Sequence, residues 1–105
     1  MSKSNIPTSV EVGELTYEVV AVPNLNDGEQ WGLSEYGDGR ISINTDTPDV
    51  FQRMIMLHEI LHTCFFNAGT HLDSETEEMV IQQLTPSLFG VLRNNPDLVK
   101  YLTGG

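Results

Sequence analysis

The stretch His58-Glu59-Ile60-Leu61-His62 decides how the rest of this sequence is interpreted. On a helix, residues four apart lie on one face, one turn from each other, so two imidazoles placed this way can bind one metal ion. Glu59 projects near the same site, where its carboxylate can take a proton from a metal-bound water. The H-E-x-x-H spacing is typical of zinc metallopeptidases. It predicts His58 and His62 as zinc ligands and Glu59 as the catalytic base.

The alternative interpretation of the motif is a chance arrangement of hydrogen-bonded core residues. Two histidines and a glutamate are costly to bury in an apolar helix unless a partner satisfies them, and a metal ion does so directly. We therefore favour metal binding, with Zn²⁺ as the cofactor. Such an ion lowers the pKa of its bound water towards about 7.

The motif lies within a predicted helix that runs from Pro48 to about residue 67. Thr47 is placed as the N-cap, Pro48 as the first helical residue and Gly69 as the C-terminal stop. Apolar residues occupy nearly every side of this segment. We therefore expect the helix to be buried all round, with Cys64 as a small core residue.

The N-terminal half of the chain has the alternating pattern of short β-strands. Residues 10–22 predict a hairpin with its turn at Gly13-Glu14, and residues 31–36 and 40–44 predict further strands. We expect a small antiparallel sheet of three to four strands, packed on the H-E-x-x-H helix.

After the motif, Ser74-Glu75-Thr76-Glu77 has the form of a capping box and predicts the start of a second helix. Pro86 is expected to kink or break that helix, and a last short helix follows Asn95. The predicted fold class is therefore α+β and zincin-like. It forms one minimal domain over residues 10–105, after a flexible lead of residues 1–9.

A catalytic zinc usually has a third protein ligand, which must lie downstream of the motif here. The downstream candidates are His71, Asp73, Glu75, Glu77 and Glu78. Glu75 is set aside because it points away from the apolar face of the second helix. The apolar face of the second helix is formed by Val80, Ile81 and Leu84. Glu77 points along the centre of that face, and Glu78 lies about 100° away from it. Glu77 is favoured as the ligand, although it is also placed to act as the capping-box residue of Ser74.

Two further segments have alternative roles in the sequence. Ile41-Ser42-Ile43 is either an ordinary edge strand or the strand that pairs with an extended substrate. His71 is either an ordinary loop residue or a donor that stabilises the transition state at the mouth of the cleft.

Composition and charge exclude several classes of function. The 105 residues carry a net charge of −10, which repels phosphate backbones and argues against nucleic-acid binding. No apolar run has the length of a membrane span, and the first residues lack a secretory signal. The single cysteine, Cys64, cannot form an internal disulfide. These features predict a cytoplasmic protein without membrane or nucleic-acid partners.

With these motifs, the chain resembles the minimal zincin-like proteins encoded by phages and prophages, which are related in plan to the ImmA/IrrE-type gluzincins. The resemblance covers most of the chain, but only H-E-x-x-H is a highly specific motif. It extends over residues 10–22, 39–44 and 56–62, Glu75-Thr76-Glu77-Glu78 and Leu92-Arg93-Asn94-Asn95-Pro96. The segment between His62 and Glu77 is shorter than in the larger ImmA/IrrE-type enzymes, which leaves little wall for a substrate cleft.

The resemblance implies a zinc-dependent peptidase whose third ligand is a glutamate from the next helix. Carried over by position, the zinc ligands are His58, His62 and Glu77, and Glu59 activates a zinc-bound water. The implied partner is a protein or peptide substrate, such as a phage or host regulatory or structural protein, in the host cytoplasm. The alternative function is a non-catalytic, zinc-stabilised phage structural or regulatory binding protein.

Overall fold

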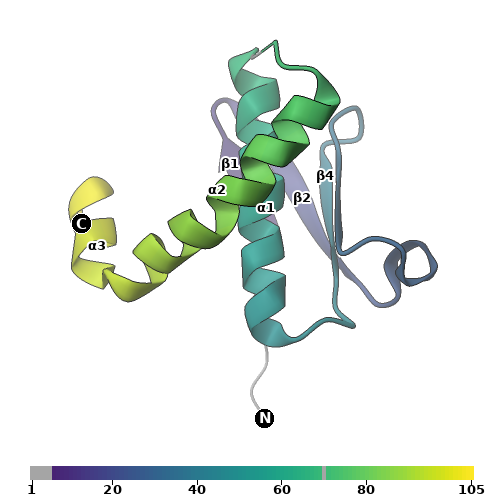
Figure 1. Cartoon of the computed structure of the whole chain (residues 1–105), viewed down its shortest axis with the longest axis horizontal. Coiled ribbons are helices and arrows are strands. Elements are labelled where there is room, and N and C mark those ends of the chain that lie inside the picture. Colours follow the sequence, from purple (N-terminus) through teal and green to yellow (C-terminus); the bar gives the residue numbers. More distant parts are fainter. Residues whose placement is uncertain (1–5, 70) are drawn as a thin grey trace.

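A small four-stranded sheet and three helices make up the fold, which we describe from a computed structural model (Figure 1). The structure describes residues 6–69 and 71–105. Helix α1, Asp49–Ala68, lies between the sheet and helix α2, Ser74–Asn94, and a short helix α3, Pro96–Leu102, ends the chain. The predicted α+β class is confirmed.

The N-terminal hairpin forms as its alternating pattern predicts. Strand β1, Ser9–Val12, pairs antiparallel with β2, Leu15–Val22, and Gly13 supplies a positive φ of 62° in the turn between them. The predicted flexible lead over residues 1–9 lies partly outside the described residues, and its last member, Ser9, is already the first residue of β1.

The sheet is mixed, whereas the sequence predicted an antiparallel one. Its order is β1-β2-β4-β3, and β4, Arg40–Asn44, pairs parallel with β2 and antiparallel with β3, Gly32–Glu35. After β2 the chain crosses to the outer position, forms β3 there and turns back to insert β4. Alternation identifies strands and their buried faces, but it does not reveal pairing order or direction.

The strand order also shows that Ile41-Ser42-Ile43, predicted as an edge strand or a substrate-pairing strand, does not lie at an edge of the sheet. Ile41 and Ile43 lie on β4, inside the sheet, and both are 0% exposed. A strand with neighbours on both sides has no free backbone groups for a peptide. The sheet has two edge strands, β1 and β3, and both contact α1. Gly32 of β3 lies against Glu59, so β3 is the edge near the motif that can take on another strand.

Helix α1 packs on the sheet through one stripe of residues rather than all round. Its buried residues follow the helical period: Gln52, Ile55, Glu59 and Thr63. Ile55 joins the core formed by Val12, Tyr17, Val19, Ile41 and Ile43. The prediction of a fully buried helix was wrong, since Cys64 is exposed and Phe66 is 51% exposed. One sheet and one crossing helix are too few layers to cover every side of α1.

Helix α2 continues through Pro86, so of the two predicted effects of this proline, a kink or a break, the break does not occur. The proline removes one backbone donor, the one that would reach the carbonyl of Gln82. Because Gln82 is exposed, water can satisfy that carbonyl. The Thr85 hydroxyl donates to the Ile81 carbonyl at 2.6 Å and adds a bond just before the proline. Across the described residues, none of the helices is both long and apolar enough to cross a membrane.

Close contact between β3 and α1 depends on a glycine at position 32. A Cβ on Gly32 would lie 2.7 Å from Ile55 Cγ2 and 3.0 Å from Glu59 Cγ. We therefore expect Gly32→Ala to lower the free energy of unfolding by about 1–3 kcal/mol, measured by urea denaturation, because the strand must move away from the helix. The control is Gly37→Ala: a Cβ there meets nothing within 4 Å. Equal effects of the two changes would contradict this packing.

Candidate metal centre

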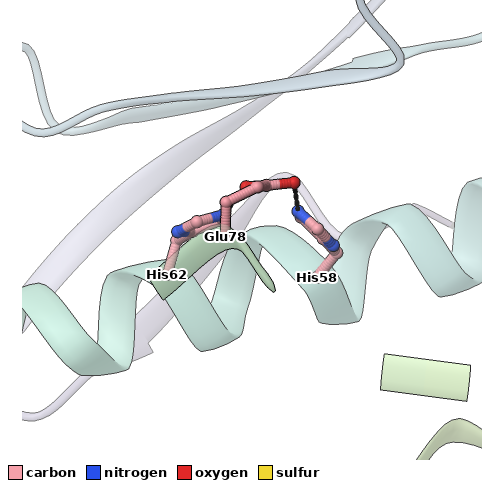
Figure 2. Close-up of side chains that lie close together, drawn as sticks. All are labelled: His58, His62 and Glu78. Atoms are coloured by element: carbon pink, nitrogen blue, oxygen red, sulfur yellow. Dashed lines mark hydrogen bonds and ion pairs between the residues drawn. The ribbon is translucent and has the colours of Figure 1, made fainter. Parts of the chain in front are cut away.

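The two histidines of the motif lie one helical turn apart on the face of α1 that α2 crosses (Figures 1 and 2). Their ring centroids are 4.9 Å apart. The side chains are mostly buried, at 21% exposure for His58 and 16% for His62. The spacing therefore brings the two imidazoles together as the sequence predicted, with room for a group from α2 between them.

That group is the carboxylate of Glu78, which reaches over from α2 to both rings (Figure 2). Its Oε1 lies 2.8 Å from Nε2 of His62, and its Oε2 lies 3.3 Å from Nε2 of His58. The candidate ligand atoms of these three residues all lie within 4.8 Å of one another. His58, His62 and Glu78 are therefore close enough to bind one metal ion.

The position of α2 is fixed by its N-terminus and by its buried stripe. Asp73, not Ser74, is the N-cap: its carboxylate accepts from the backbone N–H of Thr76 at 2.8 Å. The buried residues Ile81 and Thr85 then face the interior. Glu78 lies three residues before Ile81, on the same stripe, and this places its carboxylate over α1.

Glu77, the predicted third ligand, occupies a different position. Its Oε2 lies 2.6 Å from Nδ1 of His62, the ring nitrogen opposite the one that faces Glu78. The predicted apolar face included Leu84, which is 42% exposed, so the true buried face turns towards Glu78. This geometry revises the assignment: Glu78 completes the cluster, and Glu77 holds the His62 ring in orientation.

The other two downstream candidates lie outside the cluster. His71 is an exposed residue between the helices, and Asp73 is exposed and committed to capping α2. Glu77 was also a candidate for the capping-box residue of Ser74. Because Asp73, and not Ser74, is the N-cap, Glu77 does not have that role.

Glu59, the predicted base, is buried on the sheet-facing side of α1 at 7% exposure. Its Oε1 accepts a hydrogen bond of 2.5 Å from the hydroxyl of Ser34 on β3. A cavity of about 400 Å³ is lined by Glu59 together with His58 and Glu78. The carboxylate and two members of the metal cluster therefore border the same space.

Part of the lining of this cavity is apolar. Trp31 and Phe51 pack there with their ring centroids 5.1 Å apart, and Met54 and Pro86 complete the wall. Trp31 is 56% exposed, so much of its ring remains free for contact. A space lined by carboxylates, the His58 imidazole and aromatic rings suits part of a polypeptide chain.

Three residues beside the site were not identified from the sequence: Gly32, Ser34 and Tyr36. The rings of Tyr36 and Phe66 stack with their centroids 4.2 Å apart. Burial of Tyr36, together with the charges of Glu77 and Glu59, raises its pKa to about 12. Its hydroxyl therefore stays protonated at neutral pH. The only available signal was the alternation of β3, which places Gly32 and Ser34 on one face.

The relative importance of the two glutamates can be measured through metal affinity. We expect Glu78→Gln to weaken zinc binding by more than about 100-fold, because it removes a ligand. Glu77→Gln should weaken binding by about 10–100-fold, the usual effect of losing a residue that orients a metal-binding histidine. Competition with a chromogenic chelator measures both affinities. A larger loss for Glu77→Gln than for Glu78→Gln would contradict the revised assignment.

In the metal-free protein, we expect His62 to make the free energy of unfolding depend on pH. Burial lowers the pKa of His62, but hydrogen bonds with Glu77 and Glu78 outweigh this and raise it above 6.5. Protonated His62 therefore stabilises the fold. This stabilisation is fully present below pH 6.5 and is lost as the pH rises through the pKa of His62 in the folded protein. Urea denaturation in EDTA should show the stability advantage over His62→Gln shrinking as the pH rises above 6.5. An advantage that is constant or grows would contradict this.

Comparison of the chain with family models, with curated proteins and with solved structures found no match.

Proposed function

We propose that this chain is a zinc-dependent metallopeptidase that hydrolyses a peptide bond of a protein substrate. The observation that carries the proposal is the common cavity, bordered by two members of the His58, His62 and Glu78 cluster and by the buried carboxylate of Glu59. Two imidazole nitrogens and one carboxylate oxygen are one of the donor sets that hold catalytic zinc. A bound ion would polarise the substrate carbonyl and make water more acidic.

Within this proposal, Glu59 is the general base. Its carboxylate takes a proton from the attacking water and passes it to the leaving nitrogen as the peptide bond breaks. Burial beside His58 holds the carboxylate at the cavity. Tyr36, with a pKa of about 12, keeps its proton and does not compete with Glu59 for this role.

The substrate would lie along the edge strand β3. An extended peptide can add to this free edge by main-chain hydrogen bonds and place one side chain against Trp31 and Phe51. The cavity of about 400 Å³ admits a large apolar side chain. As in the ImmA/IrrE-type enzymes that the sequence resembles, the substrate is proposed to be a regulatory or structural protein of phage or host. The free thiol of Cys64 suits a reducing cytoplasm.

A second candidate is a zinc-stabilised binding protein without catalysis. It is favoured by the packing of α2, whose buried residues are only Ile81 and Thr85. The His58, His62 and Glu78 cluster also joins α2 to α1. A metal ion there would contribute directly to folding.

A peptide-library experiment separates the two functions. Zinc-loaded protein is incubated with a complex mixture of peptides, and new termini are identified by mass spectrometry. We expect cleavage that stops with a chelator, returns with added zinc and occurs next to large apolar residues. Zinc-loaded, folded protein that cleaves no peptide and no folded candidate substrate would support the binding protein.

A further inference from the structure

The edge strand β3 does more than border the cavity, because it contacts the proposed base directly. The Ser34 hydroxyl donates to Oε1 of Glu59 at 2.5 Å, within the range of hydrogen bonds between a hydroxyl and a charged carboxylate. Ser34 is half-buried and Glu59 is buried, so this bond is partly shielded from water. Shielding makes such a bond more effective in fixing a side chain than a surface one.

The same face of β3 is shaped to accept the Glu59 side chain. Side chains two apart on a strand point to one face, so Gly32 and Ser34 both face α1. At Gly32, a Cβ would lie 3.0 Å from Oε2 of Glu59, so a side chain at this position would crowd that oxygen. Glu59 is thus packed against a glycine on one side and hydrogen-bonded to a serine on the other.

We propose that Ser34 is a positioning residue for Glu59. The inference rests on the proposed peptidase function and adds a component that H-E-x-x-H does not contain. Ser34 occupies Oε1, so Oε2 is the oxygen left to take the proton of the attacking water and hand it to the leaving nitrogen. Because Ser34 lies on the free edge strand, a peptide added to β3 would be held in register with the base that acts on it.

Steady-state kinetics of Ser34→Ala test this role. Without the hydroxyl, the carboxylate samples other rotamers, and we expect kcat to fall by about 10- to 100-fold. KM and zinc content should stay within about twofold, since Ser34 touches neither the metal cluster nor the aromatic wall. Ser34→Thr keeps a hydroxyl on a β-branched side chain and should restore most of kcat. A fall in KM or zinc content instead of kcat, or no rescue by threonine, would overturn the proposal.

A matched control lies on the neighbouring strand. Ser42 pairs with Leu33, one position out of register with Ser34, so its side chain points to the other face of the sheet. Ser42→Ala removes the same hydroxyl from a residue that is more deeply buried than Ser34, and it should leave kcat unchanged. An equal loss in both variants would mean that a general loosening of the sheet, and not the contact with Glu59, is responsible.

Crystal structures of the metal-free wild type and Ser34→Ala give a readout that does not depend on activity. We expect the Glu59 carboxylate to be ordered in the wild type and to be rotated or disordered in the variant, with β3 in place. An unchanged Glu59 in Ser34→Ala would overturn the positioning role even if peptidase activity is present. If the protein hydrolyses nothing, the proposed function fails, and this comparison still decides whether Ser34 holds Glu59.

Discussion

Glu59→Gln is expected to lower kcat by about 10²- to 10⁴-fold and to leave zinc content and thermal stability close to those of the wild type. Glutamine has nearly the same shape as glutamate and its Oε1 still accepts from Ser34, so the packing against β3 persists. The amide cannot take a proton from water, however, and the general-base step is lost. The measurement is steady-state cleavage of a peptide found in the library experiment, with zinc determined on the same sample.

The matched control for this change is Glu75→Gln, which removes one carboxylate from an exposed position in the first turn of α2. It should retain wild-type kcat. If Glu59→Gln binds a full equivalent of zinc and keeps its activity within a few-fold, Glu59 is not the base. Loss of zinc in Glu59→Gln would instead mean that Glu59 has a structural role at the metal site.

The second large effect is expected for His58→Ala, which should abolish the stabilisation that zinc provides. An ion that binds only the folded state adds about 4 kcal/mol when its free concentration is 1,000 times its Kd. For a domain of this size that corresponds to a rise in Tm on the order of 20 °C. Differential scanning calorimetry with zinc and with EDTA should show this difference in the wild type and none in His58→Ala.

The control for the histidine change is His71→Ala. His71 is exposed and lies outside the cluster, so the zinc-dependent rise in Tm should be the same as in the wild type. Comparing the difference between zinc and EDTA, and not Tm itself, removes any effect of the substitution on the metal-free fold. A zinc-dependent rise that survives in His58→Ala would show that the ion binds elsewhere.

Local patterns were sufficient to predict most of the elements. The strand Arg40–Asn44 has the predicted bounds, α2 begins at the predicted Ser74, and Gly69 ends α1 with a φ of 70°. These features depend on residues near one another in the chain. The order of the sheet, in contrast, depends on which strands meet after the crossover that follows β2, and no local pattern contains that information.

The candidate site likewise has features that local sequence patterns predict and features that they do not. The approach of His58 to His62 follows from the helical period alone, and it forms as predicted. Which glutamate lies near both histidines depends on the rotation of α2 against α1. In the structure it is Glu78, one residue after the predicted Glu77. Ser34 is 25 positions from Glu59 in the chain, so its contact with the base required the three-dimensional structure.

We propose that His58, His62 and Glu78 hold a zinc ion beside Glu59. The most direct measurement is a crystal structure of the zinc-loaded protein, with anomalous data collected on both sides of the zinc absorption edge. We expect one zinc per chain, bound by Nε2 of each histidine and by the carboxylate of Glu78, with Glu77 on Nδ1 of His62. The claim is contradicted if no anomalous peak lies between these side chains, or if the zinc lies at Glu77 and leaves Glu78 free.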